Sequence, residues 1–211
     1  YQTLHSMQQE VKISENFIHS VEAIKSISKF AKDDAIIVTD VGAALLSGHY
    51  AFEIKNGQRF FTSQGLGEMG YGLPGAIGAA LACPEYPVLC LNCDGGMMMN
   101  LQELQTIKTH NLPVKIVIFN NDGYLMIKHT QKMLFQGHKT CVDTNTGVTL
   151  PDYKKIANAF EFPYYTEDQI DEFLNTPGLA IMEVFMDPEQ EFIPKVKGIK
   201  NQDNTITAGL L

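Results

Sequence analysis

The sequence predicts an α/β domain with a doubly wound, mainly parallel sheet and helices on both faces. Short apolar runs alternate with helical segments along residues 15–185. Most of these runs are continuously apolar, which is typical of strands that helices bury on both faces. Glycine, aspartate or asparagine follows several of them, as happens where the carboxyl ends of parallel strands face a ligand. Together these observations predict a domain that binds a ligand at one edge of its sheet.

The elements expected along the chain come from the period of the apolar residues. Strands are predicted at residues 35–39, 59–62, 88–92, 114–119, 164–166 and 179–185. Helices are predicted at residues 15–31, 71–82, 100–110 and 124–135, from residue 151, and at 167–174. Ser14 stands in the N-cap position of the first helix, and Asn100 with Glu103 has the form of a capping box. The last residues are polar, so we expect a domain at 1–192 and a loose tail at 193–211.

Length and composition limit the class of protein. With 211 residues, 45% of them hydrophobic and 19% charged, the chain can bury the core of a globular domain. A net charge of −8 argues against nucleic acid as a partner, and no basic run is present that would bind an anionic membrane. The most apolar stretch, residues 73–83, is too short to span a bilayer. The first residues lack the basic and apolar regions of a secretory signal.

The four cysteines show no spacing typical of a disulfide framework. Cys90 and Cys93 form a C-x-x-C pattern on a predicted strand. Because residues three apart on a strand point to opposite faces, we expect no shared metal or redox role for this pair. Free thiols of this kind are typical of a reducing compartment, so we expect the protein in the cytoplasm.

Asp94 and Asn121 are the residues that point most directly to a chemistry. Asp94 opens an Asp-Gly-Gly turn, expected to be exposed, after the strand at 88–92, and Asn121 follows the strand at 114–119. One β-α-β step therefore brings both residues to the carboxyl ends of neighbouring strands. A carboxylate, an amide oxygen and a backbone carbonyl make an oxygen site for a hard cation such as Mg²⁺, which the phosphates of a ligand complete. Either residue alone could be only a turn or helix-cap residue.

The order and spacing of this pair resemble the cofactor motif of the thiamine diphosphate (ThDP) enzymes. The glycine-rich stretch 62–80 resembles the part of acetolactate synthase-like members that meets the aminopyrimidine ring of the cofactor. Residues 40–42 are similar to the end of their first strand, and the resemblance covers about residues 10–190. It implies the C-terminal, diphosphate-binding domain of a longer enzyme that decarboxylates and joins 2-keto acids. Which keto acid is used stays open.

The resemblance also assigns a metal site and a diphosphate site to single residues. Asp94, the side-chain oxygen of Asn121 and the backbone carbonyl of Gly123 would bind Mg²⁺. Gly95 and Gly96 would present backbone N–H groups to the diphosphate, as anion-binding nests do.

For the rest of the cofactor, the resemblance assigns residues on two other segments. The carbonyl of Gly67 would accept from the 4′-amino group, and Met69 would lie as a wedge beneath the bent cofactor. Asp40 and Gly42 would complete the cofactor site at the end of the first strand. No catalytic residue is expected in this chain, because the family's activating glutamate lies on the pyrimidine-binding domain of a partner subunit. The resemblance therefore implies that the enzyme is a homo-oligomer. The chain alone is expected to be inactive.

Two positions depart from the family pattern. Cys93 stands where glycine is usual, so its side chain can crowd the phosphate or change the turn. Ala43 and Ala44 stand where acetolactate synthases tend to have Gln-His. The two alanines remove side-chain donors from the diphosphate, which weakens the specific acetolactate assignment.

Two other functions stay open. Gly65, Gly67 and Gly70 match the G-x-G-x-x-G pattern of an NAD(P)-binding Rossmann domain, as in an oxidoreductase. Glu85 or Asp94 would be its acidic partner, but this interpretation leaves the Asn-Asn pair after the next strand unexplained. The other alternative is a non-catalytic domain that retains the fold.

The residues after the metal turn have two interpretations. In one of them the substrate pocket is shaped by Tyr124, Met126, Ile127 and Gln131. In the other they belong to an ordinary amphipathic helix. His49 is expected on the surface of a helix rather than as a catalytic base.

Overall fold

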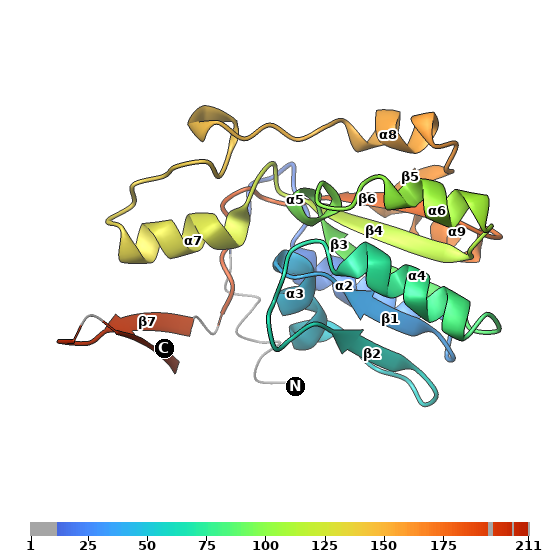
Figure 1. The fold of residues 1–211 in the computed structure, drawn as a ribbon, viewed down its shortest axis with the longest axis horizontal. Coiled ribbons are helices and arrows are strands. Elements are labelled where there is room, and N and C mark those ends of the chain that lie inside the picture. Colours follow the sequence, from blue (N-terminus) through green and yellow to red (C-terminus); the bar gives the residue numbers. More distant parts are fainter. Residues whose placement is uncertain (1–11, 194–195, 204, 211) are drawn as a thin grey trace.

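A computed structural model describes residues 12–193, 196–203 and 205–210. Its main sheet has six parallel strands in the order β2-β1-β3-β4-β6-β5 (Figure 1). They are β1 (Ile36–Thr39), β2 (Arg59–Thr62), β3 (Val88–Cys93), β4 (Val114–Asn120), β5 (Tyr164–Thr166) and β6 (Ala180–Phe185). Each lies within one residue of its predicted ends, and the parallel pairing confirms the predicted α/β fold.

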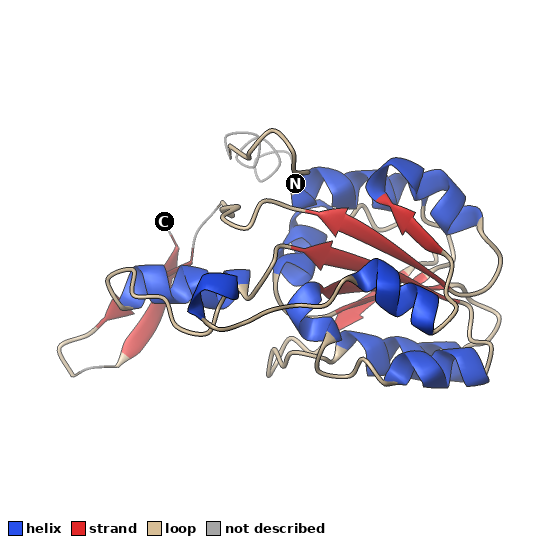
Figure 2. Ribbon diagram, turned by 90° about the horizontal axis from the view of Figure 1, so that it is seen from above, coloured by secondary structure: helices blue, strands red, loops and turns tan. Residues whose placement is uncertain are grey.

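Helices cover both faces of this sheet (Figure 2). Buried residues of one face form an apolar cluster with α2 (Ser20–Phe30), α3 (Ala43–Ala51) and α9 (Ile170–Asn175). Those of the other face form a second cluster with α4 (Gly72–Ala82), α6 (Glu103–Thr109) and α8 (Tyr153–Ala159). Helices on both faces explain why the strands are apolar throughout.

Strand β3 shows how alternating residues supply both clusters. Leu89 and Leu91 join the cluster of α2 and α3, whereas Val88 and Cys90 join the cluster of α4 and α6. Cys93 lies with Leu91, so the two cysteines of the C-x-x-C pattern lie on opposite faces, as predicted. All four cysteines of the chain are free thiols.

The strand order reverses between β1 and β3. Strand β1 has β2 on one side and β3 on the other, and β3 continues to β4. The connection after β1 is α3 on one face, and the connection after β3 is α6 on the other. Open α/β sheets bind ligands in the crevice outside the carboxyl ends at such a reversal. The short helix α5 (Asp94–Met97) follows β3 at this place.

The first helix begins later than predicted. Helix α2 starts at Ser20, and the ring of His19 accepts a hydrogen bond from a backbone N–H of its first turn. Ser14 does not cap a helix. Its N–H and its hydroxyl both donate to the carboxylate of Asp187, at 2.8 Å each.

The predicted capping box at Asn100 is also wrong. Helix α6 begins at Glu103, and Nδ2 of Asn100 donates to the carbonyl of Gly70 at 2.8 Å. Glu103 accepts a hydrogen bond from the hydroxyl of Thr106 within its own helix. Asn100 therefore ties the segment before α6 to the glycine-rich loop after β2.

The bounds of helix α3 were not predicted, because its residues are small or apolar on all sides and show no helical period. His49 is exposed on this helix, in agreement with its expected place on a helix surface. The other elements on the main domain are α7 (Leu125–Leu134) and the 3-10 helices η1 (Thr144–Thr146) and η2 (Glu167–Gln169).

The C-terminal residues are not the loose tail that was predicted. Strands β7 (Val196–Lys200) and β8 (Ile206–Leu210) pair as an antiparallel hairpin, which lies beside α7 and apart from the main sheet (Figure 1). The expected lack of a secretory signal concerns residues that lie outside the described ranges. None of the helices in the described ranges has both the length and the apolar character that crossing a bilayer demands.

Candidate functional site

A pocket of about 290 Å³ opens where the strand order reverses. Its walls come from the ends of β1, β3 and β4, from the loop after β2 and from the first turn of α7. Of the residues expected to bind the cofactor, all except Asp40 line this pocket. They are Gly42, Gly67, Met69, Asp94, Gly95, Gly96, Asn121 and Gly123. The fold thus brings these separate segments of the chain to one place.

The carboxylate of Asp94 is held by backbone N–H groups from two segments. The N–H of Gly95 donates to Oδ1 at 2.8 Å. The N–H groups of Asn121 and Gly123 donate to Oδ2 at 2.9 and 3.1 Å. Asp94 has no exposed surface, so the expectation of an exposed turn is wrong. The side chain therefore joins the end of β3 to the turn after β4.

Burial raises the pKa of Asp94 to about 7, because the charged carboxylate has lost its contact with water. The N–H groups of Gly123, Gly95 and Asn121 act in the opposite direction and lower the pKa of this carboxyl. A bound cation would also favour the charged form. The site therefore holds a buried carboxylate whose ionisation a metal ion would support.

Asn121 carries an oxygen that has no partner. The residue is 3% exposed, and its Oδ1 receives no hydrogen bond within the described part of the chain. Its Nδ2 lies 3.3 Å from Oδ1 of Asp94, the longest contact made to that carboxylate. A buried polar atom without a partner is costly unless a ligand completes it. A carboxylate beside an unpaired amide oxygen fits an oxygen-ligated cation such as Mg²⁺.

The neighbouring asparagine is satisfied at both ends. Nδ2 of Asn120 donates to the carboxylate of Glu183 at 2.6 Å, and its Oδ1 accepts the N–H of Asp122 at 2.9 Å. Of the two adjacent asparagines, only Asn121 lines the pocket. Asn120 thus shapes the turn, whereas Asn121 is available to a ligand.

Two glycines of the site pack so closely that a side chain would not fit. A Cβ on Gly95 would lie 2.3 Å from the ring of Tyr124. A Cβ on Gly123 would lie 2.2 Å from the carbonyl oxygen of Val142, and Gly123 has a φ of 150°. Met69 also approaches Gly95, with its terminal carbon 3.3 Å from the same Cβ position. These contacts keep the backbone itself at the surface of the pocket.

Asp40 is close to the pocket but does not line it. Its buried carboxylate accepts the N–H of Gly70 at 2.9 Å and the N–H of Gly72 at 3.0 Å. Burial raises the pKa of Asp40, and these hydrogen bonds lower it. The carboxylate therefore fixes the glycine-rich loop that carries Gly67 and Met69.

Cys93 turns its side chain towards the start of α3. Its Sγ accepts the N–H of Ala44 at 3.3 Å and would lie 3.0 Å from a Cβ on Gly42. Burial raises the pKa of this thiol, so it is neutral at ordinary pH. Cys93 and Ala43 both line the pocket. The thiol thus occupies a backbone N–H in the first turn of α3, next to the pocket.

Tyr153 supports the site from α8, and nothing in the sequence pointed to it. The residue is 1% exposed, and its hydroxyl donates to the carbonyl of Asp94 at 2.5 Å. Burial raises the pKa of Tyr153, so the hydroxyl keeps its proton. A tyrosine 59 positions along the chain from its partner leaves no local pattern that could have identified it.

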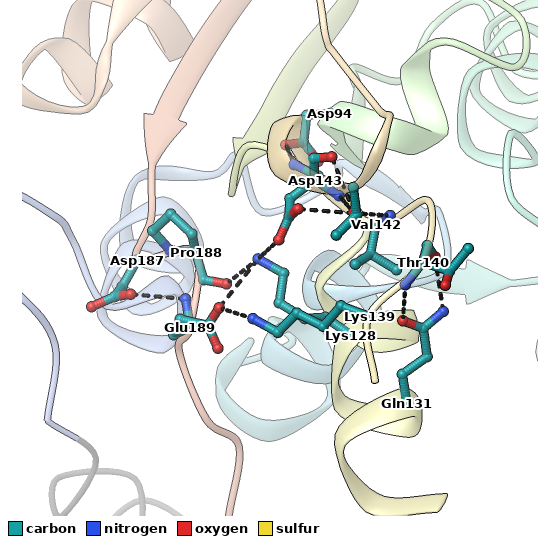
Figure 3. A network of polar contacts seen from close by, with 12 residues as sticks. Asp94, Lys128, Gln131, Lys139, Thr140, Val142, Asp143, Asp187, Pro188 and Glu189 are labelled. Carbon is teal, nitrogen blue, oxygen red and sulfur yellow. Dashed lines mark hydrogen bonds and ion pairs between the residues drawn. The ribbon is translucent and has the colours of Figure 1, made fainter. Parts of the chain in front are cut away.

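Lys128 is a second supporting residue that the sequence did not indicate (Figure 3). Its buried ammonium donates to the carbonyl of Pro188 at 3.0 Å and lies 3.7 Å from Asp143 and 3.5 Å from Glu189. The carbonyl of Val142, next to Asp143, accepts the N–H of Tyr124, the residue before α7, at 2.8 Å. Lys128 thus joins α7, the loop after it and the segment after β6.

The first turn of α7 forms an apolar wall of the pocket. Tyr124, Met126 and Ile127 line the pocket, as the first of the two interpretations expected. Gln131 does not line it. Both ends of its amide bind the backbone of Thr140 at 2.9 Å, which holds the loop after α7 against the helix.

A family model described as "Thiamine pyrophosphate enzyme, C-terminal TPP binding domain" matches residues 40–184. The chain belongs to the thiamine pyrophosphate enzymes. The match extends from the end of β1 into β6, so it includes every residue that lines the pocket. The predicted resemblance to this family is therefore confirmed.

Curated proteins that are similar to this thiamine pyrophosphate enzyme domain include several acetolactate synthases. The isozyme 1 large subunit of Escherichia coli (strain K12) is 36% identical over 180 residues, which is 82% of this chain and 32% of the relative. A probable large subunit from Methanococcus aeolicus is 37% identical over 162 residues, 74% of this chain and 26% of the relative. A chloroplastic acetolactate synthase of Nicotiana tabacum is 31% identical over 198 residues, 89% of this chain and 30% of the relative. The chain thus spans about a third of their length.

The topology and the family match both argue against an NAD(P)-binding Rossmann domain. A dinucleotide fingerprint follows a strand at the reversal of the sheet. Here the loop with Gly65, Gly67 and Gly70 follows β2, which is an edge strand. The N–H of Gly70 is used by the carboxylate of Asp40. The glycines therefore belong to a loop that Asp40 fixes, and Gly67 of this loop lines the pocket.

Proposed function

We propose that this domain binds ThDP and Mg²⁺ within a longer, acetolactate synthase-like enzyme that decarboxylates a 2-keto acid and joins the product to an acceptor. The observation that best supports the proposal is the unpaired Oδ1 of Asn121 beside the buried carboxylate of Asp94. This pair lies at the carboxyl ends of β3 and β4, where a diphosphate would reach both residues.

In the proposed site, three groups hold the metal ion. Asp94 supplies the protein charge, Asn121 supplies its unpaired oxygen, and the backbone carbonyl of Gly123 is the third ligand. Gly95 and Gly96 place backbone N–H groups next to the diphosphate. Phosphate oxygens then complete the coordination of the ion.

When bound, ThDP supplies the nucleophilic carbon and the electron sink that decarboxylation of a 2-keto acid requires. The chain contributes binding, orientation and exclusion of water. Met69 would lie as a wedge against the cofactor, and the carbonyl of Gly67 would accept from its amino group. The apolar side chains of Met126 and Ile127 shield the reacting end from water.

A second protein domain completes the proposed active site. We propose that the pyrimidine-binding domain of a partner subunit supplies the activating glutamate and the opposite wall, so the enzyme works as a homo-oligomer. The chain spans about a third of its relatives' length, which agrees with a further domain. The free thiols support the cytoplasm as its compartment. On this account the chain alone releases no CO₂ from pyruvate with ThDP and Mg²⁺, and sustained release would contradict the proposed division of labour.

Titration calorimetry with three ligand mixtures tests the proposal. ThDP with Mg²⁺ is expected to bind, ThDP with a chelator is expected to bind much more weakly, and NAD is expected to give no heat. Binding of NAD alone would favour the oxidoreductase. Binding of ThDP by a full-length protein that turns over no 2-keto acid would favour the non-catalytic domain.

A further inference from the structure

A second pocket, of about 300 Å³, lies where the central strands begin, at the opposite ends of the strands from the pocket described above. It is formed by the first residues of β3 and β4, the end of α2 and the turn after α9. Strand β3 thus begins at this pocket, with Val88, and ends at the cofactor pocket, with Cys93. Pro87, Pro113 and Leu174 give it apolar walls.

Lys115 lines this second pocket and is the charged residue of the mainly apolar strand β4. The residue is 8% exposed, although it stands between two fully buried neighbours in β4. Its ammonium donates to the carbonyl of Thr176 at 2.5 Å and to the carbonyl of Gly178 at 2.6 Å. An ammonium has three N–H donors, so one remains without an acceptor among the described residues.

Lys32 adds a second positive charge to the same pocket. The chain has 24 acidic and 16 basic residues, yet no aspartate or glutamate lines this pocket within the described ranges. Asp33, next to Lys32 in the sequence, pairs instead with Lys55 at 3.2 Å. Lys55 also donates to the carbonyls of Lys29 and Ala31 at the end of α2, so these carbonyls already have a lysine donor other than Lys32. The pocket therefore has two cations and no anion.

We propose that this pocket binds a small aliphatic monocarboxylate. The carboxylate accepts the third N–H of Lys115 and is attracted by Lys32, while the hydrocarbon chain packs against Pro87, Pro113 and Leu174. The apolar walls disfavour inorganic phosphate, which needs donors on all sides. One buried ammonium matches one carboxylate. This inference does not depend on the proposed function, because none of these residues lines the cofactor pocket.

Titration calorimetry of the 211-residue chain at pH 7 with butyrate tests this inference. Butyramide is the matched neutral ligand, because it has the same shape and no charge. Butyrate is expected to bind with a Kd on the order of 1 mM, and butyramide at least about tenfold more weakly. No heat with butyrate up to about 50 mM, or equal binding of the two ligands, would overturn the proposal.

Three variants place the binding at this pocket. Lys115→Met removes the buried donor and is expected to weaken butyrate binding by more than about tenfold. Lys32→Gln removes an exposed charge and is expected to weaken it by about threefold. Lys29→Gln is the matched control, since Lys29 lies in the last turn of α2, close to Lys32 in the sequence but outside the pocket, and should leave the Kd unchanged.

The outcomes of these variants are decisive even if one of them fails to fold. If Lys115→Met is unfolded, the contrast between Lys32→Gln and Lys29→Gln decides alone. Equal losses in those two variants would show a general charge effect and overturn the site. Saturating ThDP and Mg²⁺ should leave the Kd for butyrate unchanged, and competition would place butyrate in the cofactor pocket instead.

Discussion

The strands of the sheet end at what we call its carboxyl edge and begin at its amino edge. Each of these two edges buries a side chain of opposite charge, which backbone N–H groups satisfy at the first and backbone carbonyls at the second. At the carboxyl edge, Asp94 is a buried anion that accepts three backbone N–H groups. At the amino edge, Lys115 is a buried cation that donates to two backbone carbonyls. In a parallel α/β sheet, the helices begin at the carboxyl edge and end at the amino edge. Their free N–H groups and carbonyls therefore lie at the edges where an anion and a cation are stabilised.

The two edges differ in what remains unsatisfied. At the carboxyl edge an acceptor is left over, the Oδ1 of Asn121, and this suits a cation. At the amino edge a donor of Lys115 is left over, and this suits an anion. Each buried charge thus serves as part of the fold, and on our proposals each is also half of a ligand site.

The largest effect is expected for Asp94→Ala. The change leaves three backbone N–H groups without their acceptor, and we expect it to lower the free energy of unfolding by about 3 kcal/mol. It also removes the proposed metal ligand, so Mg²⁺-dependent binding of ThDP should be lost. Urea denaturation measures the first effect and calorimetry the second. A variant as stable as the parent would contradict the role assigned to the carboxylate in the fold.

Lys115→Met tests the other edge, and the expected loss of stability is smaller, about 1 kcal/mol, because methionine keeps the apolar stem and removes a buried charge. Its pH dependence is more informative. Burial, with a smaller contribution from Lys32, lowers the pKa of Lys115 from 10.5 to about 8. Between these values the unfolded chain binds more protons than the folded chain, so stability rises with pH.

We therefore expect the parent to gain stability relative to Lys115→Met between pH 8 and pH 10, by an amount on the order of 1 kcal/mol. Urea denaturation of both proteins across this range measures the difference. Parallel pH profiles would show that Lys115 does not titrate in this window. Binding of butyrate should weaken over the same range, since the neutral amine cannot balance the carboxylate.

The smallest effect is expected for Cys93→Gly, which frees the N–H of Ala44 for a phosphate oxygen. We expect ThDP with Mg²⁺ to bind about fivefold more tightly. Cys93→Ser is the matched control, because its hydroxyl can still accept from Ala44 and should keep the affinity near that of the parent. Calorimetry measures both. An unchanged Kd in the glycine variant would mean that this N–H does not face the diphosphate.

The sequence predicted the strands well but placed the starts of α2 and α6 too early, for a physical reason. Strands buried on both faces are apolar runs that can be read locally. The start of α2 depends instead on a contact across the fold, since the N–H of Ile18 donates to the carbonyl of Phe185 and draws that segment alongside the end of β6. Asn100 likewise does not cap a helix, because its side chain donates to the carbonyl of Gly70 across the fold.

In the cofactor pocket, too, some features could be predicted from local sequence and others depend on contacts across the fold. The spacing of Asp94 and Asn121 along one β-α-β step was enough to place both at one edge of the sheet. The burial of Asp94 could not be read from its turn, because it results from segments that fold over it later in the chain. Tyr153 belongs to one of those segments, and only the folded chain brings its hydroxyl to the carbonyl of Asp94. Lys128 lies on α7 and joins this helix to Asp143 in the loop after it.

The adjacent asparagines allow the most direct test of the central claim, that the unpaired oxygen of Asn121 is a metal ligand. Asn121→Ala removes an oxygen without a partner and one long contact, from Nδ2 to Asp94 at 3.3 Å, so the free energy of unfolding should change by less than about 1 kcal/mol. Asn120→Ala is the matched control, because it breaks two hydrogen bonds and should cost about 1–2 kcal/mol.

Calorimetry of ThDP with Mg²⁺ on these two variants and the parent then separates the roles of the two residues. The account predicts that Asn121→Ala keeps its stability and loses Mg²⁺-dependent binding, whereas Asn120→Ala loses stability and still binds the cofactor. Binding by Asn121→Ala as tight as that of the parent would contradict the assignment of this pocket as the site of the metal and its diphosphate.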